Sequence, residues 1–121
     1  MERVTGIGGV FFRAKDPEAL SAWYTTHLGV DMSAGAWQQE AGYTVFAPFP
    51  QDTDYFGKDS QAFMLNFRVN DLQAMMAQLR DAGIEVLTDP AWDMPEVGAF
   101  ARIHDPEGNP IELWQPATPP A

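Results

Sequence analysis

Two arginines and one glutamate are the side chains of this chain best suited to bind a small polar ligand. Residues 12–16 (FRAKD) match residues 67–71 (FRVND) position by position, so Arg13 and Arg68 occupy equivalent places. Because side chains alternate along a strand, both guanidinium groups are expected on the sheet face that the helices leave uncovered, together with Glu112. One carboxylate neutralises only one guanidinium group, so the pattern predicts a second anion, supplied by the protein or by a ligand.

The same alternation assigns further side chains to this face of the sheet. They are Phe11, Thr44, Phe46, Met64, Asn66 and Trp114. Such a mixture suits a small ligand with an apolar body and a polar or anionic group. Two alternatives stay open: Glu112 pairs with Arg13 or Arg68, because a buried carboxylate needs a partner, or the methionine and aromatic positions serve only core packing.

The elements that carry these side chains are predicted to occur twice, each time in the order β, α, β, β, β. In the first half, Asp16 is a good helix N-cap, Pro17 suits the first helical position and Gly29 suits the end, which predicts a helix over residues 17–27. Strands of this half are expected at residues 5–14, 30–33, 36–40 and 43–47.

The second half repeats this order. A strand is expected at residues 62–69, followed by a helix that Asp71 caps and Gly83 ends. Residues 85–87, 98–104 and 111–115 read as the remaining strands, and the run DPEG at 105–108 has the proline and glycine placement of a type I turn. An internal repeat of mixed helices and strands predicts an α+β fold.

Two aromatic-containing segments, residues 48–60 and 88–97, do not fit the repeat. Phe49, Tyr55 and Phe56 in the first segment and Trp92 in the second give each an apolar anchor. Ordered loops that cover a cavity carry such anchors, but so do linkers whose aromatic rings merely pack on the core. The sequence leaves both interpretations open.

Length and composition limit the class of protein. The 121 residues, 45% of them hydrophobic, predict one domain over residues 1–121, with module one at about 4–48, a link at about 48–60 and module two at about 61–117. The net charge of −10 disfavours nucleic acid and anionic membranes as partners. The absence of cysteine excludes disulfides and thiolate metal sites, and the lack of a long apolar run or a signal-peptide pattern favours a cytoplasmic location.

Four motifs stand in an order and spacing typical of one known superfamily. They are the strand leading to Asp16, the run Ala22-Trp23-Tyr24 with Leu28-Gly29, residues 67–72 (FRVNDL) and residues 105–113 (DPEGNPIEL). Through them, nearly the whole chain resembles the vicinal oxygen chelate superfamily of glyoxalase I, bleomycin-resistance proteins and extradiol dioxygenases. The resemblance implies an α+β fold of two tandem βαβββ modules, which form a curled mixed sheet around a shared cavity.

The resemblance also implies a divalent metal held at four positions, which in this chain are Gly9, Thr44, Met64 and Glu112. Glycine offers no ligand, a thioether is too soft for the usual cations and a threonine hydroxyl binds weakly. Only Glu112 matches, so no metal cofactor is expected; the alternative is one divalent metal at Glu112. His27, expected in the last turn of a helix, and His104, expected at a strand end, are not predicted to complete a metal site.

Three functions follow from this pattern. The preferred one is a small-molecule-binding protein of the vicinal oxygen chelate type without the usual metal. The alternative is a metal-dependent glyoxalase-like lyase or isomerase in which Glu112 is the catalytic proton shuttle. The third is an interaction module with a closed pocket. The resemblance also implies a homodimer.

Overall fold

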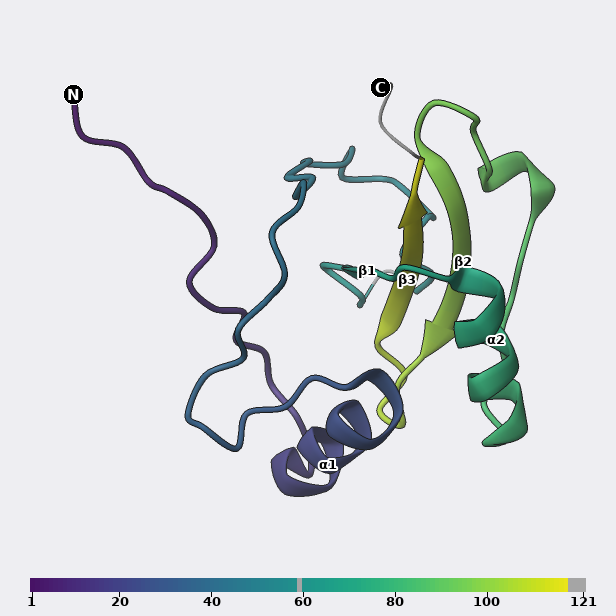
Figure 1. Ribbon diagram of the computed structural model, residues 1–121, viewed down its shortest axis with the longest axis horizontal. Coiled ribbons are helices and arrows are strands. Elements are labelled where there is room, and N and C mark those ends of the chain that lie inside the picture. Colours follow the sequence, from purple (N-terminus) through teal and green to yellow (C-terminus); the bar gives the residue numbers. More distant parts are fainter. Residues whose placement is uncertain (59, 118–121) are drawn as a thin grey trace.

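The fold is described from a computed structural model, which covers residues 1–58 and 60–117. It contains two α-helices, a short 3-10 helix and three strands: α1 (Pro17–Leu28), β1 (Leu65–Arg68), α2 (Leu72–Asp81), η1 (Pro90–Trp92), β2 (Gly98–His104) and β3 (Pro110–Pro116). The strands form one sheet in the order β1-β3-β2, with β1 parallel and β2 antiparallel to β3. Figure 1 shows α2 lying beside this sheet and α1 below it. The predicted α+β class is confirmed.

Both helices begin where the sequence predicts; α1 extends one residue beyond the prediction, to Leu28, and α2 ends at Asp81, two residues before Gly83. Asp16 accepts a hydrogen bond from the Ala19 backbone N–H at the start of α1, and Gly29 ends that helix in the left-handed conformation with φ of 72°. Asp71 accepts from the Ala74 N–H at the start of α2. These carboxylates satisfy N–H groups that have no partner within the helix, which explains why each helix starts after an aspartate.

The second half forms the predicted sheet. Strand β2 spans the predicted residues, and β3 extends the predicted strand by one residue at each end. The predicted strand at 62–69 is shortened to β1, and the one at 85–87 is reduced to a single bridge between Leu87 and Arg102. The core lies between this sheet and the helices, and its fully buried members on the sheet are Ala101, Ile103, Ile111 and Leu113.

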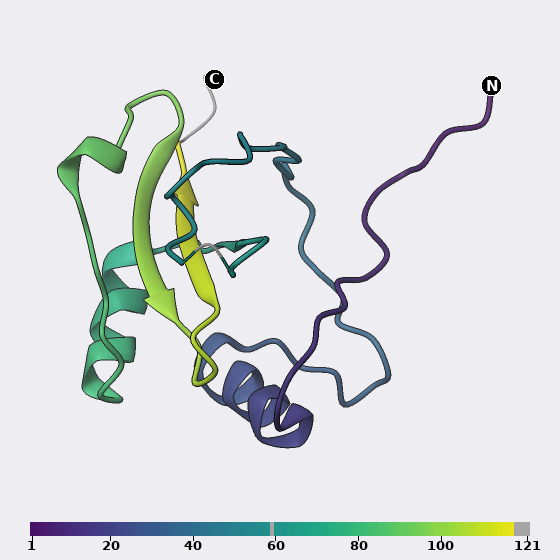
Figure 2. The same cartoon turned by 180° about the vertical axis from the view of Figure 1, so that it is seen from behind.

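The first half forms α1 but none of the predicted strands within the described residues. Figures 1 and 2 both show the N-terminal segment running away from the sheet, and the chain after α1 swinging out beside that segment before it returns to the sheet. The strand predictions at 5–14, 30–33, 36–40 and 43–47 are therefore wrong for this structure. Alternation and β-propensity supply a suitable surface, but a strand also needs a hydrogen-bonding neighbour, which local sequence does not provide.

The consequence is that several large apolar side chains of the first half face solvent. Phe11 is 95% exposed and Phe46 is 84% exposed. Phe12 and Ala14 are the parts of the N-terminal segment that do pack against the core. Within residues 1–58 and 60–117, none of the helices combines the length and apolarity that crossing a membrane requires.

Candidate ligand-binding site

A row of three polar side chains crosses the sheet on the face opposite the core. The strand register places Asn66 of β1 beside Glu112 of β3, and Glu112 beside Arg102 of β2. Ile111 and Leu113, the chain neighbours of Glu112, are fully buried in the core, so Glu112 lies on the other face, as alternation predicts. We name Asn66, Glu112 and Arg102 the polar row.

The Glu112 carboxylate is buried and has two hydrogen-bond donors. The Asn66 side-chain amide donates to Oε1 at 2.7 Å, and the Tyr55 hydroxyl donates to Oε2. Burial, reinforced by the hydrogen bond to Glu112, raises the pKa of Tyr55 to about 12. No ion pair joins Glu112 to Arg13 or Arg68 within residues 1–58 and 60–117, so the alternative in which one of these arginines pairs with it is wrong.

Arg102 is the charged neighbour of Glu112, and its guanidinium group is incompletely satisfied. Its Nη2 donates to the Tyr55 carbonyl oxygen at 3.0 Å. The guanidinium carbon lies 4.8 Å from the centre of the Tyr55 ring and 5.8 Å from the Trp92 ring, both within the range of a cation–π contact. Its buried Nε has no hydrogen-bond partner in the part of the chain that the structure describes. A buried donor without a partner is costly.

The two arginines predicted to converge have separate surroundings. Arg68 donates from Nη2 to the Glu40 carbonyl oxygen at 3.1 Å, and its guanidinium fills the space where a side chain at Gly42 would lie. Arg13 is exposed on the N-terminal segment and has no hydrogen bond among the described residues. Arg68 therefore contacts the backbone of the first half, and within the described residues no hydrogen bond joins Arg13 and Arg68 to a common partner.

The remaining predicted site residues divide between the sheet and the first half. Trp114 is buried on β3, where its Nε1 donates to the Val97 carbonyl oxygen at 2.9 Å and its ring stacks on Phe100. Met64 is half-buried immediately before β1. Phe11, Thr44 and Phe46 are exposed and lie on first-half segments that form no strand.

Sequence reasoning missed Arg102 and underused Tyr55 and Trp92. The signal for Arg102 was available, since Ala101 and Ile103 belong to the core and the residue between them must therefore face the same side as Glu112. Tyr55 and Trp92 were identified only as apolar anchors of loops. Their contacts with Arg102 support the interpretation that both loops cover this face of the sheet.

The donor set around Glu112 does not fit a divalent metal. Of the four family ligand positions, Glu112 alone carries a carboxylate, and one carboxylate does not make a metal site. Of the other family ligand positions, Gly9 has no side chain and Met64 carries a soft thioether. No group of three or more histidine, aspartate or glutamate side chains is close enough to hold a metal within the described residues.

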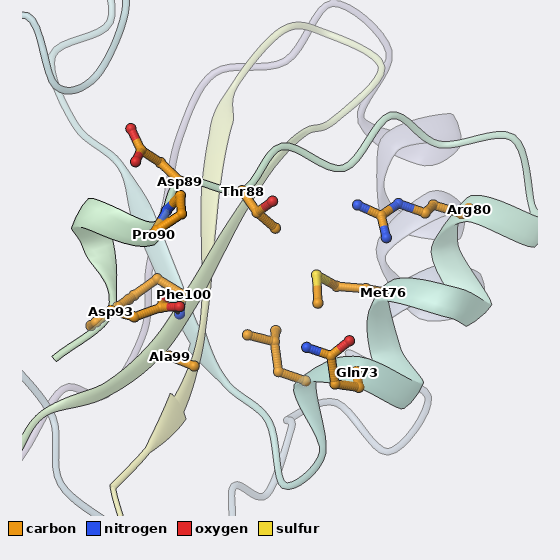
Figure 3. Close-up of a pocket in the computed structure, with 10 residues that line it drawn as sticks. Gln73, Met76, Arg80, Thr88, Asp89, Pro90, Asp93, Ala99 and Phe100 are labelled. Atoms are coloured by element: carbon orange, nitrogen blue, oxygen red, sulfur yellow. Dashed lines mark hydrogen bonds between the residues drawn. The ribbon is translucent and has the colours of Figure 1, made fainter. Parts of the chain in front are cut away.

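A separate cavity of about 290 Å³ lies between α2, η1 and β2. Figure 3 shows Gln73, Met76 and Arg80 projecting into it from α2, opposite Asp89 and Asp93. Both carboxylates accept backbone hydrogen bonds, from Ala91 and Phe100, so they stabilise the loop around η1. None of the polar row lines this cavity.

A mixed sheet with one face packed on helices and buried charged groups on the opposite face defines a small α+β domain. A family model described as a glyoxalase-like domain matches residues 9–114. The chain belongs to this family, and with it to the vicinal oxygen chelate superfamily.

Known relatives and structures agree with this assignment. The protein named "Putative glyoxylase CFP32" is 30% identical over 113 residues in both Mycobacterium bovis and Mycobacterium tuberculosis, which covers 84% of this chain and 40% of the relative. The chain thus spans about two fifths of the length of these relatives. The crystal structure of TnmS3, an antibiotic binding protein from Streptomyces sp. CB03234, aligns over 97% of this chain and 100% of its own at 21% identity, with a TM-score of 0.60. This likeness establishes the glyoxalase fold.

Proposed function

We propose that this chain binds a small molecule on the polar-row face of the sheet and that it does so without a metal. The observation that carries the proposal is the incomplete satisfaction of Arg102, whose buried Nε lacks a partner among the described residues beside a buried carboxylate. A ligand with an apolar body and a polar group would supply that partner and would pack against Trp92 and Trp114. The family membership and the antibiotic-binding activity named for TnmS3 support binding as the function.

The first experiment is an NMR titration of the whole chain with three small probes, cyclohexanol, benzoate and p-cresol. Binding of any of them should shift the backbone amides next to Asn66, Arg102 and Glu112. Arg102→Met keeps the apolar stem and removes the charge, so it should weaken that binding by about tenfold, whereas Arg80→Met, at the separate cavity, should leave it unchanged. Saturating probes that leave the polar-row amides unshifted would refute the proposal.

The metal-free part of the proposal is tested by elemental analysis and native mass spectrometry of protein purified without chelator or nickel affinity. The donor set at Glu112 predicts no stoichiometric divalent metal and a thermal midpoint that zinc, nickel or manganese shifts little, because stabilisation requires appreciable affinity for the native state. One tightly held metal per chain that is lost in Glu112→Gln would instead support the glyoxalase-like lyase or isomerase, with Glu112 as proton shuttle.

We also propose that the chain functions as a homodimer. The exposed Val10, Phe11, Val45 and Phe46 support this, since a monomer rarely leaves so many apolar side chains uncovered in extended segments. A second copy would cover them and could bring the first-half candidates Phe11, Arg13, Thr44 and Phe46 to the site. Sedimentation that finds only a 13.4 kDa species at high protein concentration contradicts this proposal.

A further inference from the structure

Tyr55 is bound by the polar row in the way that a small ligand would be bound. Its hydroxyl donates to Glu112, its ring lies 4.8 Å from the Arg102 guanidinium carbon, and its carbonyl oxygen accepts from Arg102 Nη2 at 3.0 Å. Two buried, charged side chains of the sheet therefore recognise one aromatic side chain. That side chain comes from a segment 57 residues before Glu112 in the chain.

The segment that carries Tyr55 has no regular secondary structure among its described residues. No described residue between Gly29 and Met64 lies in a helix or strand, and Asp52, Asp54 and Gly57 around Tyr55 are exposed. Tyr55 itself is half-buried, and its other contacts are local: its N–H donates to Thr53 Oγ1 at 3.2 Å and its ring stacks on Phe49. Glu112 and Arg102, by contrast, are fixed in paired strands. Displacing Tyr55 thus costs little regular structure.

The contacts of Tyr55 also define the chemistry of a molecule that could replace it. Glu112 accepts a hydrogen bond and repels an anion, so it selects a neutral hydroxyl over a carboxylate. The planar guanidinium of Arg102 favours the face of an aromatic ring over an aliphatic one. Both preferences are met together by a hydroxylated aromatic ring.

We propose that Tyr55 occupies the ligand position of this site as an internal mimic, and that the ligand is a phenol-type molecule whose hydroxyl donates to Glu112 and whose ring lies on Arg102 after Tyr55 is displaced. This inference rests on the proposed small-molecule function and specifies its ligand class. The competition between Tyr55 and the ligand makes the segment around Tyr55 a gate, which opens when a stronger binder of the same chemistry arrives.

The test compares p-cresol, which has the shape and hydroxyl of the tyrosine side chain, with toluene, which lacks the hydroxyl. Tyr55→Ala empties the position, so it should bind p-cresol at least about tenfold more tightly than the parent and prefer it to toluene by a similar factor. Tyr55→Phe retains the packing and frees the Glu112 acceptor, so it should show a smaller gain in p-cresol affinity. Tyr43→Ala, which removes a tyrosine that is 77% exposed, is the matched control and should behave as the parent.

A further variant tests the role of the carboxylate. In the Tyr55→Ala background, Glu112→Gln replaces a charged acceptor with a neutral one and should reduce the preference for p-cresol over toluene severalfold. The inference is overturned if neither Tyr55 variant gains affinity for p-cresol, or if toluene binds as tightly as p-cresol. Should the parent bind benzoate or cyclohexanol at the polar row while the Tyr55 variants gain nothing for p-cresol, small-molecule binding stands and the phenol inference alone fails.

Discussion

Two buried carboxylates of this molecule, those of Asp105 and Glu112, accept hydrogen bonds from the same kinds of side chain but differ in how many hydrogen bonds they accept. Asp105, in the turn between β2 and β3, accepts from the Tyr24 hydroxyl and from the Asn109 side chain, each at 2.8 Å, and also from the backbone N–H groups of Glu107 and Asn109. Glu112 likewise accepts from a tyrosine hydroxyl and an asparagine amide, but it has no backbone donor among the described residues.

The donors of the two carboxylates differ in how firmly they are fixed. Tyr24 is a buried residue of α1, and Asn109 is four residues from Asp105 in the same turn. Tyr55 belongs to a segment without regular structure, and Asn66 is exposed. The carboxylate of Asp105 joins the turn to α1, whereas that of Glu112 lies beside Arg102, whose Nε has no hydrogen-bond partner among the described residues. A saturated carboxylate stabilises the fold; one with replaceable donors is available to a ligand.

The largest expected effect comes from removing the saturated carboxylate. Asp105→Ala should lower the free energy of unfolding by about 3 kcal/mol, because it leaves the Tyr24 hydroxyl and two backbone N–H groups without their acceptor. Urea unfolding monitored by circular dichroism measures this change. A loss below about 1 kcal/mol would show that water replaces Asp105 easily, and the contrast with Glu112 would disappear.

Removing the hydroxyl group from Tyr24 and from Tyr55 gives a matched comparison of the two carboxylate sites. Tyr24→Phe should destabilise the protein by about 1–2 kcal/mol, since it removes one buried hydrogen bond to Asp105. Tyr55→Phe should cost less than about 0.5 kcal/mol, because its hydroxyl is on a half-buried loop residue and solvent can replace it. Equal losses of unfolding free energy in urea would mean that the Tyr55 segment is held as firmly as α1. That result would contradict the proposed gate.

Tyr24 and Tyr55 should also differ in the pH at which their hydroxyl groups ionise. Burial, with help from the neighbouring carboxylates, raises the pKa of Tyr55 to about 12 and that of Tyr24 further still. A pKa raised by folding means that the neutral form is stabilised in the folded state. The resulting contribution is complete below the unfolded pKa of about 10 and is lost as the pH rises through the folded pKa.

This linkage has a direct spectroscopic measurement. Ultraviolet titration of the parent minus that of Tyr55→Phe should isolate a phenol that ionises near pH 12, and Glu112→Gln should move this ionisation to lower pH because a negative neighbour is removed. The Tyr55 segment should detach from the sheet in the same range, between about pH 10 and 12. If the Glu112→Gln variant titrates as the parent does, Tyr55 does not contact Glu112 in solution.

How far the sequence predicts this molecule depends on how local the responsible interactions are. The caps at Asp16 and Asp71, the span of β2 and the side of the sheet that Glu112 faces all follow from neighbouring residues, and all are found. The pairing of the first-half strands and the contact of Tyr55 with Glu112 depend on residues far apart in the chain, for which a single sequence gives no distance. Arg102 is different, because the alternation that identified Glu112 also applied to it.

A small effect on stability is also expected at Arg68, which the internal repeat made prominent. Arg68→Met removes the hydrogen bond to the Glu40 carbonyl oxygen but keeps the apolar stem, so the free energy of unfolding should change by less than about 1 kcal/mol. Binding of p-cresol in the Tyr55→Ala background should also change less than twofold, because Arg102 rather than Arg68 contacts the Tyr55 position. Arg102→Met in the same background should reduce that binding by about tenfold. A larger loss from Arg68→Met than from Arg102→Met would restore the repeat-derived arginine as the recognition residue, and would require the segment around Glu40 to move away so that Arg68 can reach the ligand.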